Sequence, residues 1–247
     1  MEIKVIVGDI SRIETDAVIV NHFEDVKSLE GDIAKVDKAL DGAVSQLIKQ
    51  GEIKGKLNEI TLVHSLGKLP AARVVVVGLG KPSELTTNKI RGAVAETCRW
   101  LRSKDVSNIA TIPQGAGINN ISPEDAALAI AEGALLGTYT FRKHITREED
   151  KPGEIKKLSI VSPDQMKPQL EQGINKGIIL AEAANLARNM VNEPANYMTP
   201  TDMAEMAKAL AKDYGLEITI LEREQMKELG MGCLLYTSPS PRDLSTS

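Results

Sequence analysis

Short apolar runs alternate with longer segments of helical periodicity along the first two thirds of the chain. The apolar runs are almost uninterrupted, which is typical of strands buried on both faces of a sheet. They predict strands at residues 3–7, 16–21, 59–63, 73–77, 108–112 and 157–161. Apolar residues at helical spacing predict helices at 34–49, at 87–103 and from Ser122 to about Phe141. This alternation predicts an α/β fold with a mostly parallel sheet flanked by helices.

A second pattern starts after a long predicted helix at residues 169–192. Thr199 and Asp202 enclose a proline at the first helical position, which is a strong helix start. The apolar alternation at 217–221 predicts a strand, and 222–229 predicts a short helix. Because one βα unit is too small to bury both faces of its strand, we expect this to be the first unit of a larger α/β domain.

The pattern divides the chain into four parts. They are an N-terminal domain at 1–165, a linker helix at 166–192, the start of a truncated second domain at 193–232 and a tail at 233–247. The tail is rich in Ser, Thr and Pro, has no periodicity and resembles translated sequencing-adapter sequence. The alternative is a natural disordered tail. We expect a non-native tail, because the periodic pattern stops at residue 233, inside a βα unit and not after a finished domain.

Composition narrows the class of protein. The net charge is −4, with 30 basic and 34 acidic residues, and no basic run predicts nucleic-acid binding. Two cysteines, Cys98 and Cys233, form neither a disulfide framework nor a metal-binding spacing, which favours a reducing cytoplasm. No apolar run approaches the roughly 20 residues that a membrane span needs.

Local motifs for catalysis are weak. The three histidines, His22, His64 and His144, form no paired metal motif, so we expect them to be exposed or hydrogen-bonded. The acidic run at 148–150 predicts a solvated loop. Two glycine-rich stretches follow strands. The one at 77–81 is similar to a dinucleotide-binding turn but lacks the third glycine, and the one at 114–117 could approach a phosphate; a plain turn is the favoured interpretation of both.

The junction between the two predicted domains carries a longer motif. It reads Ala-Arg-x-x-Val-Asn-x-Pro-x-Asn-x-x-Thr-Pro at 187–200 and is followed by Glu-Leu-Gly-Met-Gly at 228–232. These two motifs, in this order, resemble the motifs that leucyl aminopeptidases carry at their domain junction. Pro194 and Pro200 fix the backbone, and none of the motif residues is a nucleophile or metal ligand, so their roles are predicted to be architectural.

The resemblance implies a function for the intact protein. It implies a hydrolase, a metallopeptidase that removes Leu-like N-terminal residues from peptides with two divalent metals, Mn or Zn, in a cytoplasmic homohexamer. Two metals can bridge a water molecule and lower its pKa. The family's ligands come from Lys-Gly-x-x-x-Asp-Ser-Gly-Gly and Asn-Thr-Asp-Ala-Glu-Gly-Arg segments, and neither occurs in this sequence. The resemblance therefore implies no catalytic, metal-binding or substrate-binding residue in this chain, and no activity.

The first domain carries a second resemblance. Gly8, Asp9 and Ile10, followed by the run at 16–21, are similar to the opening of a macro domain, a fold that often binds ADP-ribose. This resemblance implies that Asp9, Asn21 and the loop at Gly115 would hold a nucleotide. The alternatives for this domain are therefore a nucleotide-binding module and a ligand-free assembly domain, without membrane or nucleic-acid partners.

Overall fold

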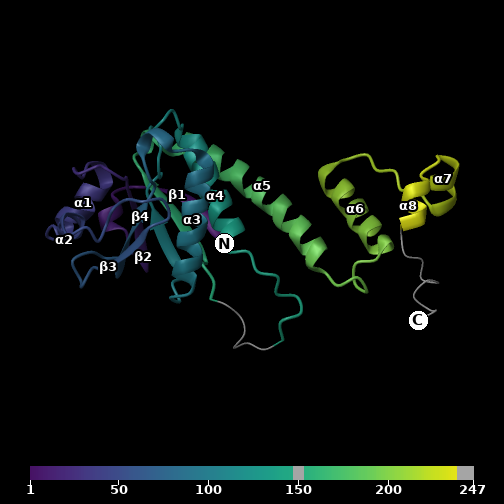
Figure 1. Ribbon diagram of the computed structural model, residues 1–247, viewed down its shortest axis with the longest axis horizontal. Helices are drawn as coiled ribbons and strands as arrows, with labels where there is room; N and C mark the ends of the chain where they lie inside the picture. Colours follow the sequence, from purple (N-terminus) through teal and green to yellow (C-terminus); the bar gives the residue numbers. More distant parts are fainter. Residues whose placement is uncertain (147–152, 238–247) are drawn as a thin grey trace. The chain divides into compact units, whose positions relative to one another are not determined.

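The structure of the protein is a computed structural model that describes residues 1–146 and 153–237. It divides into two compact units, Met1–Asn189 and Met190–Ser247 (Figure 1). The predicted acidic loop at 148–150 and the last part of the predicted tail, 238–247, lie outside the described residues.

The first unit is built on a six-stranded sheet. Its strands are β1 (Glu2–Val7), β2 (Ala17–His22), β3 (Ile60–His64), β4 (Arg73–Gly78), β5 (Asn108–Thr111) and β6 (Lys157–Ser162). The order across the sheet is β1-β6-β5-β2-β4-β3, and only β3 is antiparallel to its neighbour. The predicted α/β class with a mostly parallel sheet is confirmed, because each predicted apolar run forms a strand.

Helices cover both faces of this sheet. The bounds are α1 (Gly31–Ala39), α2 (Ala43–Lys49), α3 (Thr87–Arg102), α4 (Pro123–Gly137) and α5 (Lys167–Asn192), with short 3-10 turns η1 (Ile10–Arg12), η2 (Pro82–Glu84) and η4 (Asp164–Met166). Ile19 and Val75 pack under α3, α4 and the start of α5, whereas Val18 and Val74 pack under α1 and α2. The strands are therefore buried on both faces, as their uninterrupted apolar runs predict.

Two predicted helices differ from the structure. The single helix expected at 34–49 is two helices, because Asp41 and Gly42 adopt left-handed φ angles of 55° and 80°. The helix that Ser122 caps begins as expected, with the Ser122 hydroxyl accepting a hydrogen bond from the Asp125 backbone N–H. It ends at Gly137 rather than near residue 141. The β-branched and aromatic residues at 138–141 have low helix propensity.

α5 lies unusually close to α4. A Cβ atom at Gly173 would lie 2.1 Å from the carbonyl oxygen of Glu124, and one at Gly177 would lie 2.7 Å from that of Leu128. One turn apart on α5, these two positions have to be glycine for the backbones to approach at this distance. The contact buries the first half of α5, including Leu170 and Ile174.

The second unit contains α6 (Pro200–Tyr214), α7 (Arg223–Glu228) and α8 (Gly232–Thr237). The helix start predicted at Thr199 is confirmed, since Thr199 and Asp202 form a capping box. The strand predicted at 217–221 is wrong: these residues form neither helix nor strand. The described residues of this unit offer no second strand, and a strand needs a hydrogen-bonded neighbour.

Candidate functional site

The strand β2 ends at a point where the chain connections diverge. After β2 the chain enters α1, whereas after the neighbouring strands β4 and β5 it enters α3 and α4 on the opposite face. Ligands of open α/β sheets bind in the crevice that such a divergence leaves outside the carboxyl ends of the strands. The carboxyl end of β2 is therefore where a ligand site is expected on topology alone.

A cavity of about 320 Å³ lies at this end of β2. Three chain segments form its wall: the end of β2 with the loop into α1, the turn after β4 and the loop after β5. The lining residues are Asn21, His22, Phe23, Val26, Ser28, Leu29, Glu30, Ile33, Pro82 and Ile118. The wall is thus mainly apolar, with a few polar groups, which is the composition of small-molecule sites.

The residues before β3 pack closely against the ends of β2 and β4. A Cβ atom at Gly78 would lie 1.9 Å from the carbonyl oxygen of Lys56, and one at Gly55 would lie 2.4 Å from the carbonyl carbon of Phe23. The Glu59 carboxylate accepts hydrogen bonds of 2.8 and 2.7 Å from the backbone N–H groups of Lys54 and Gly55. These contacts fix the backbone that carries Phe23 into the cavity.

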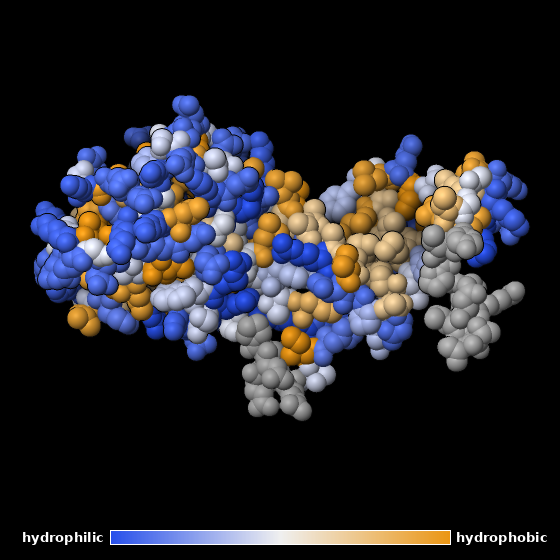
Figure 2. Space-filling view, viewed as in Figure 1, coloured by the Kyte–Doolittle hydropathy of each residue, from blue (hydrophilic) through white to orange (hydrophobic). Residues whose placement is uncertain are grey.

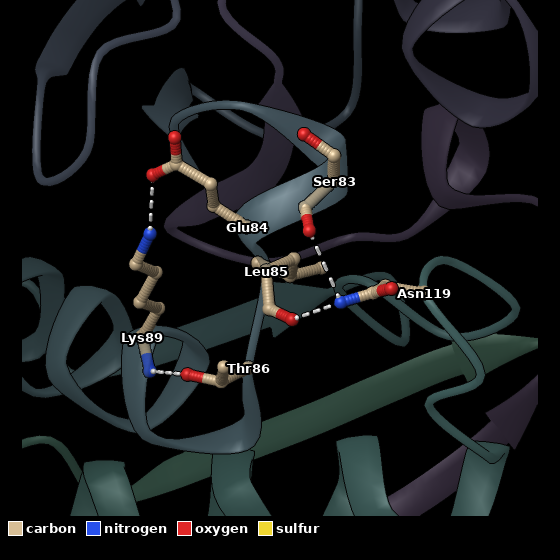
Figure 3. Close-up of polar contacts among 6 residues, drawn as sticks. All are labelled: Ser83, Glu84, Leu85, Thr86, Lys89 and Asn119. Atoms are coloured by element: carbon tan, nitrogen blue, oxygen red, sulfur yellow. Dashed lines mark hydrogen bonds and ion pairs between the residues drawn. The ribbon is translucent and has the colours of Figure 1, made fainter.

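A side-chain amide connects the other two wall segments (Figure 3). The Nδ2 atom of Asn119 donates to the carbonyl oxygens of Leu85 at 2.9 Å and Ser83 at 3.4 Å. Asn119 has a left-handed φ of 47°, a conformation that asparagine adopts more readily than most residues. The amide thereby holds the loop that carries Ile118 beside the turn that carries Pro82.

Three side chains of the wall determine its hydrogen-bonding groups and its charge. The Asn21 amide makes no hydrogen bond to any residue that the structure describes. His22 is 4% exposed, and burial lowers its pKa below the ordinary value of 6.5, although the Glu59 charge opposes this shift. Glu30 places a carboxylate at the N-terminus of α1, and no lysine or arginine lines the described cavity.

Only one of the three residues implied for nucleotide binding lines this cavity. Asn21 does, but Asp9 and Gly115 do not. The Asp9 carboxylate instead accepts hydrogen bonds from the backbone N–H and hydroxyl of Ser11, at 2.9 and 2.7 Å. Partial burial would raise the pKa of Asp9, but the hydrogen bonds from Ser11 and the charges of Lys35 and Arg12 together lower it.

The loop at Gly115 is held against α3. A Cβ atom at Gly115 would lie 2.8 Å from side-chain atoms of both Ile90 and Leu85, and the residue has a left-handed φ of 76°. The glycine is therefore explained by packing and by backbone conformation. The neighbouring Gln114 is buried and donates to the Thr111 hydroxyl, while its Oε1 atom accepts no hydrogen bond within the described part of the chain.

Other candidates for chemistry do not converge. Among residues 1–146 and 153–237, no three His, Cys, Asp or Glu side chains form a group that could hold a metal ion. His64 is exposed at the end of β3, and the ring of His144 lies 5.7 Å from that of Phe141. Cys98 is buried, which raises the pKa of its thiol to about 12. Within the described helices, none is both long enough and apolar enough to cross a membrane.

Comparisons with known proteins identify the family. The N-terminal domain of the cytosol aminopeptidase family matches residues 19–146, and the catalytic domain of the same family matches residues 185–241. A probable cytosol aminopeptidase of Alkaliphilus metalliredigens is 40% identical over 238 residues, and one of Alkaliphilus oremlandii is 35% identical over 236. Each alignment covers 95% of this chain and 47% of the relative. The chain belongs to the cytosol aminopeptidase family.

Solved structures share the fold. A mutant of tomato leucine aminopeptidase matches with a TM-score of 0.79 and 23% identity, over 98% of this chain and 48% of that one. The bottromycin maturation enzyme BotP in complex with Mn matches with a TM-score of 0.65 and 22% identity, over 88% of this chain and 40% of that one. The chain thus spans about half the length of the curated relatives that it matches.

Proposed function

We propose that this chain is the amino-terminal portion of a metal-dependent aminopeptidase. The observation that carries the proposal is the alignment with probable cytosol aminopeptidases over 95% of this chain. The match to the catalytic domain from residue 185 onward supports it further. The full-length protein would hydrolyse the N-terminal residue of peptides, with a preference for Leu-like side chains, as a cytoplasmic homohexamer.

The metal site belongs to the proposed full-length enzyme and not to this chain. The sequence lacks both family segments that would supply the metal ligands. Two divalent ions, Mn or Zn, would polarise the peptide carbonyl and activate a water molecule there. BotP, which shares the fold, is described in complex with Mn. We therefore propose that the chain alone has no peptidase activity.

A chimeric protein tests the proposed activity. Residues 1–232 are joined to the carboxyl-terminal half of the Alkaliphilus metalliredigens relative, at the position aligned with Gly232, and the release of p-nitroaniline from leucine p-nitroanilide is followed with added Mn²⁺ or Zn²⁺. We expect release that a chelator abolishes. A folded chimera that binds Mn²⁺ but releases no product would contradict the proposal.

The same assay tests the inactivity of the chain alone. The purified 247-residue chain should release no product above the rate without protein, because it lacks the ligand segments. The full-length relative from Alkaliphilus metalliredigens serves as the active control. Chelator-sensitive, saturable release that co-elutes with the chain in gel filtration would show that we have assigned the site wrongly.

A further inference from the structure

We propose that the cavity at the carboxyl end of β2 binds an uncharged nucleoside-like heterocycle and discriminates against its phosphorylated forms. The inference concerns the first unit alone and does not depend on the peptidase activity proposed above. Three observations carry it: the position and size of the cavity, the amide of Asn21, and the charge of the wall.

The position and size fit a small planar ligand. The cavity lies at the divergence point of the sheet, and its volume of about 320 Å³ falls at the lower end of the range for ligand pockets. Phe23, Ile33, Pro82 and Ile118 provide apolar surface against which a ring can pack. A cavity of this volume suits one heterocycle with its sugar and not a dinucleotide.

The polar group that fits the edge of a heterocycle is a side-chain amide. The Asn21 amide offers a donor and an acceptor in one plane, and both are unused within the described residues. Such an amide pairs with the adjacent donor and acceptor of a base, as asparagine does with adenine.

The charge of the wall selects against phosphate. A helix N-terminus favours anions, and α1 begins at this cavity. However, Glu30 places a carboxylate at this helix end, Asp32 is paired there with Lys35 at 2.8 Å, and no lysine or arginine lines the described cavity. A phosphate would therefore meet the Glu30 charge without a compensating cation, whereas an uncharged ligand would not.

Isothermal titration calorimetry of the full chain with adenosine, guanosine, cytidine and uridine tests the inference, with AMP and ADP-ribose as the charged counterparts. We expect saturable binding of at least one nucleoside, roughly tenfold or more tighter than its 5′-monophosphate. If none of the four nucleosides binds, or if the monophosphate or ADP-ribose binds as tightly as the nucleoside, the proposal is overturned.

Variants locate the site. Glu30→Lys should strengthen binding of the monophosphate roughly tenfold relative to the nucleoside, and Glu171→Lys, the same charge change on α5 outside this cavity, should leave that ratio unchanged.

Asn21→Leu should weaken nucleoside binding roughly tenfold by removing the paired donor and acceptor. Ile118→Trp, which fills the cavity from a loop, should abolish binding even if Asn21→Leu fails to fold. Unchanged binding by the folded variants would place the ligand elsewhere.

Discussion

At the scale of single residues, burial decides what the polar groups near β2 can do. The sequence places His22 after an apolar run and predicts an exposed or hydrogen-bonded side chain. In the structure His22 is 4% exposed and lines the cavity, because the loop into α1 and the residues before β3 enclose it. The lowered pKa of His22 is a consequence of this enclosure.

Burial of His22 predicts a pH dependence of stability. The folded-state pKa lies below the unfolded value of about 6.5, so the unfolded chain binds the proton first as the pH falls. The contribution to the free energy of unfolding is present above that value and is lost as the pH falls through the folded-state pKa. Urea unfolding between about pH 5 and 7 should show a smaller pH dependence for His22→Gln than for the unaltered chain. His64 and His144 are present in both proteins. If the unfolding free energy changed equally with pH in both, His22 would not be the source of the pH dependence.

Sequence alone predicts part of the candidate site. The resemblance to a macro domain points to Asn21, which lines the cavity. Phe23, Pro82 and Ile118 are not predictable, because they come from three separate segments. Their approach depends on close backbone contacts, such as that of Gly78 with Lys56, which leave no periodic signal.

At the scale of helices and strands, the hydrophobic pattern predicts an element correctly where that element is fully buried. The six strands of the first unit are predicted because their residues face apolar neighbours on both sides. The break between α1 and α2 has a local signal, the Asp41-Gly42 pair, which is typical of turns. The prediction of a strand at 217–221 is wrong, because alternating apolar and polar residues form a strand only when a neighbouring strand is available for hydrogen bonding.

The close approach of α5 to α4 predicts opposite effects of two glycine substitutions. Gly173→Ala places a methyl group 2.1 Å from the Glu124 carbonyl oxygen, so the helices have to separate, and we expect a loss of about 1–3 kcal/mol of unfolding free energy. Gly92→Ala on the exposed face of α3 meets no atom within 4 Å and should stabilise by about 0.5–1 kcal/mol through helix propensity. Chemical denaturation measures both. Equal changes for the two variants would contradict the close packing.

At the scale of the whole molecule, the second unit buries little of its apolar surface. Its exposed apolar side chains include Tyr214, Leu216 and Leu229, which are 73%, 63% and 62% exposed. Figure 2 shows apolar patches over this unit, whereas the visible face of the first unit is largely hydrophilic. The chain spans about half the length of its curated relatives, so the rest of the proposed catalytic domain would cover this surface.

A weakly packed second unit predicts where proteases cut first. Residues 193–198 follow α5 and include Tyr197, which is 57% exposed, so chymotrypsin should cleave after Tyr197 early. Trp100, held in α3, is the internal control and should be cut only after global unfolding. Mass spectrometry of a short digestion distinguishes the two sites. Protection of Tyr197 for as long as Trp100 would show that the second unit is well anchored.

The reading frame of the source nucleic acid tests the central claim, that this chain is part of a two-metal aminopeptidase. The measurement is to amplify and read the codons from Leu229 through Leu235 and beyond. We expect the frame to continue past Gly232 into segments encoding Lys-Gly-x-x-x-Asp-Ser-Gly-Gly and Asn-Thr-Asp-Ala-Glu-Gly-Arg. A frame that ends at Ser247 would contradict this claim and would leave the first unit, with its cavity at β2, as the functional part of the molecule.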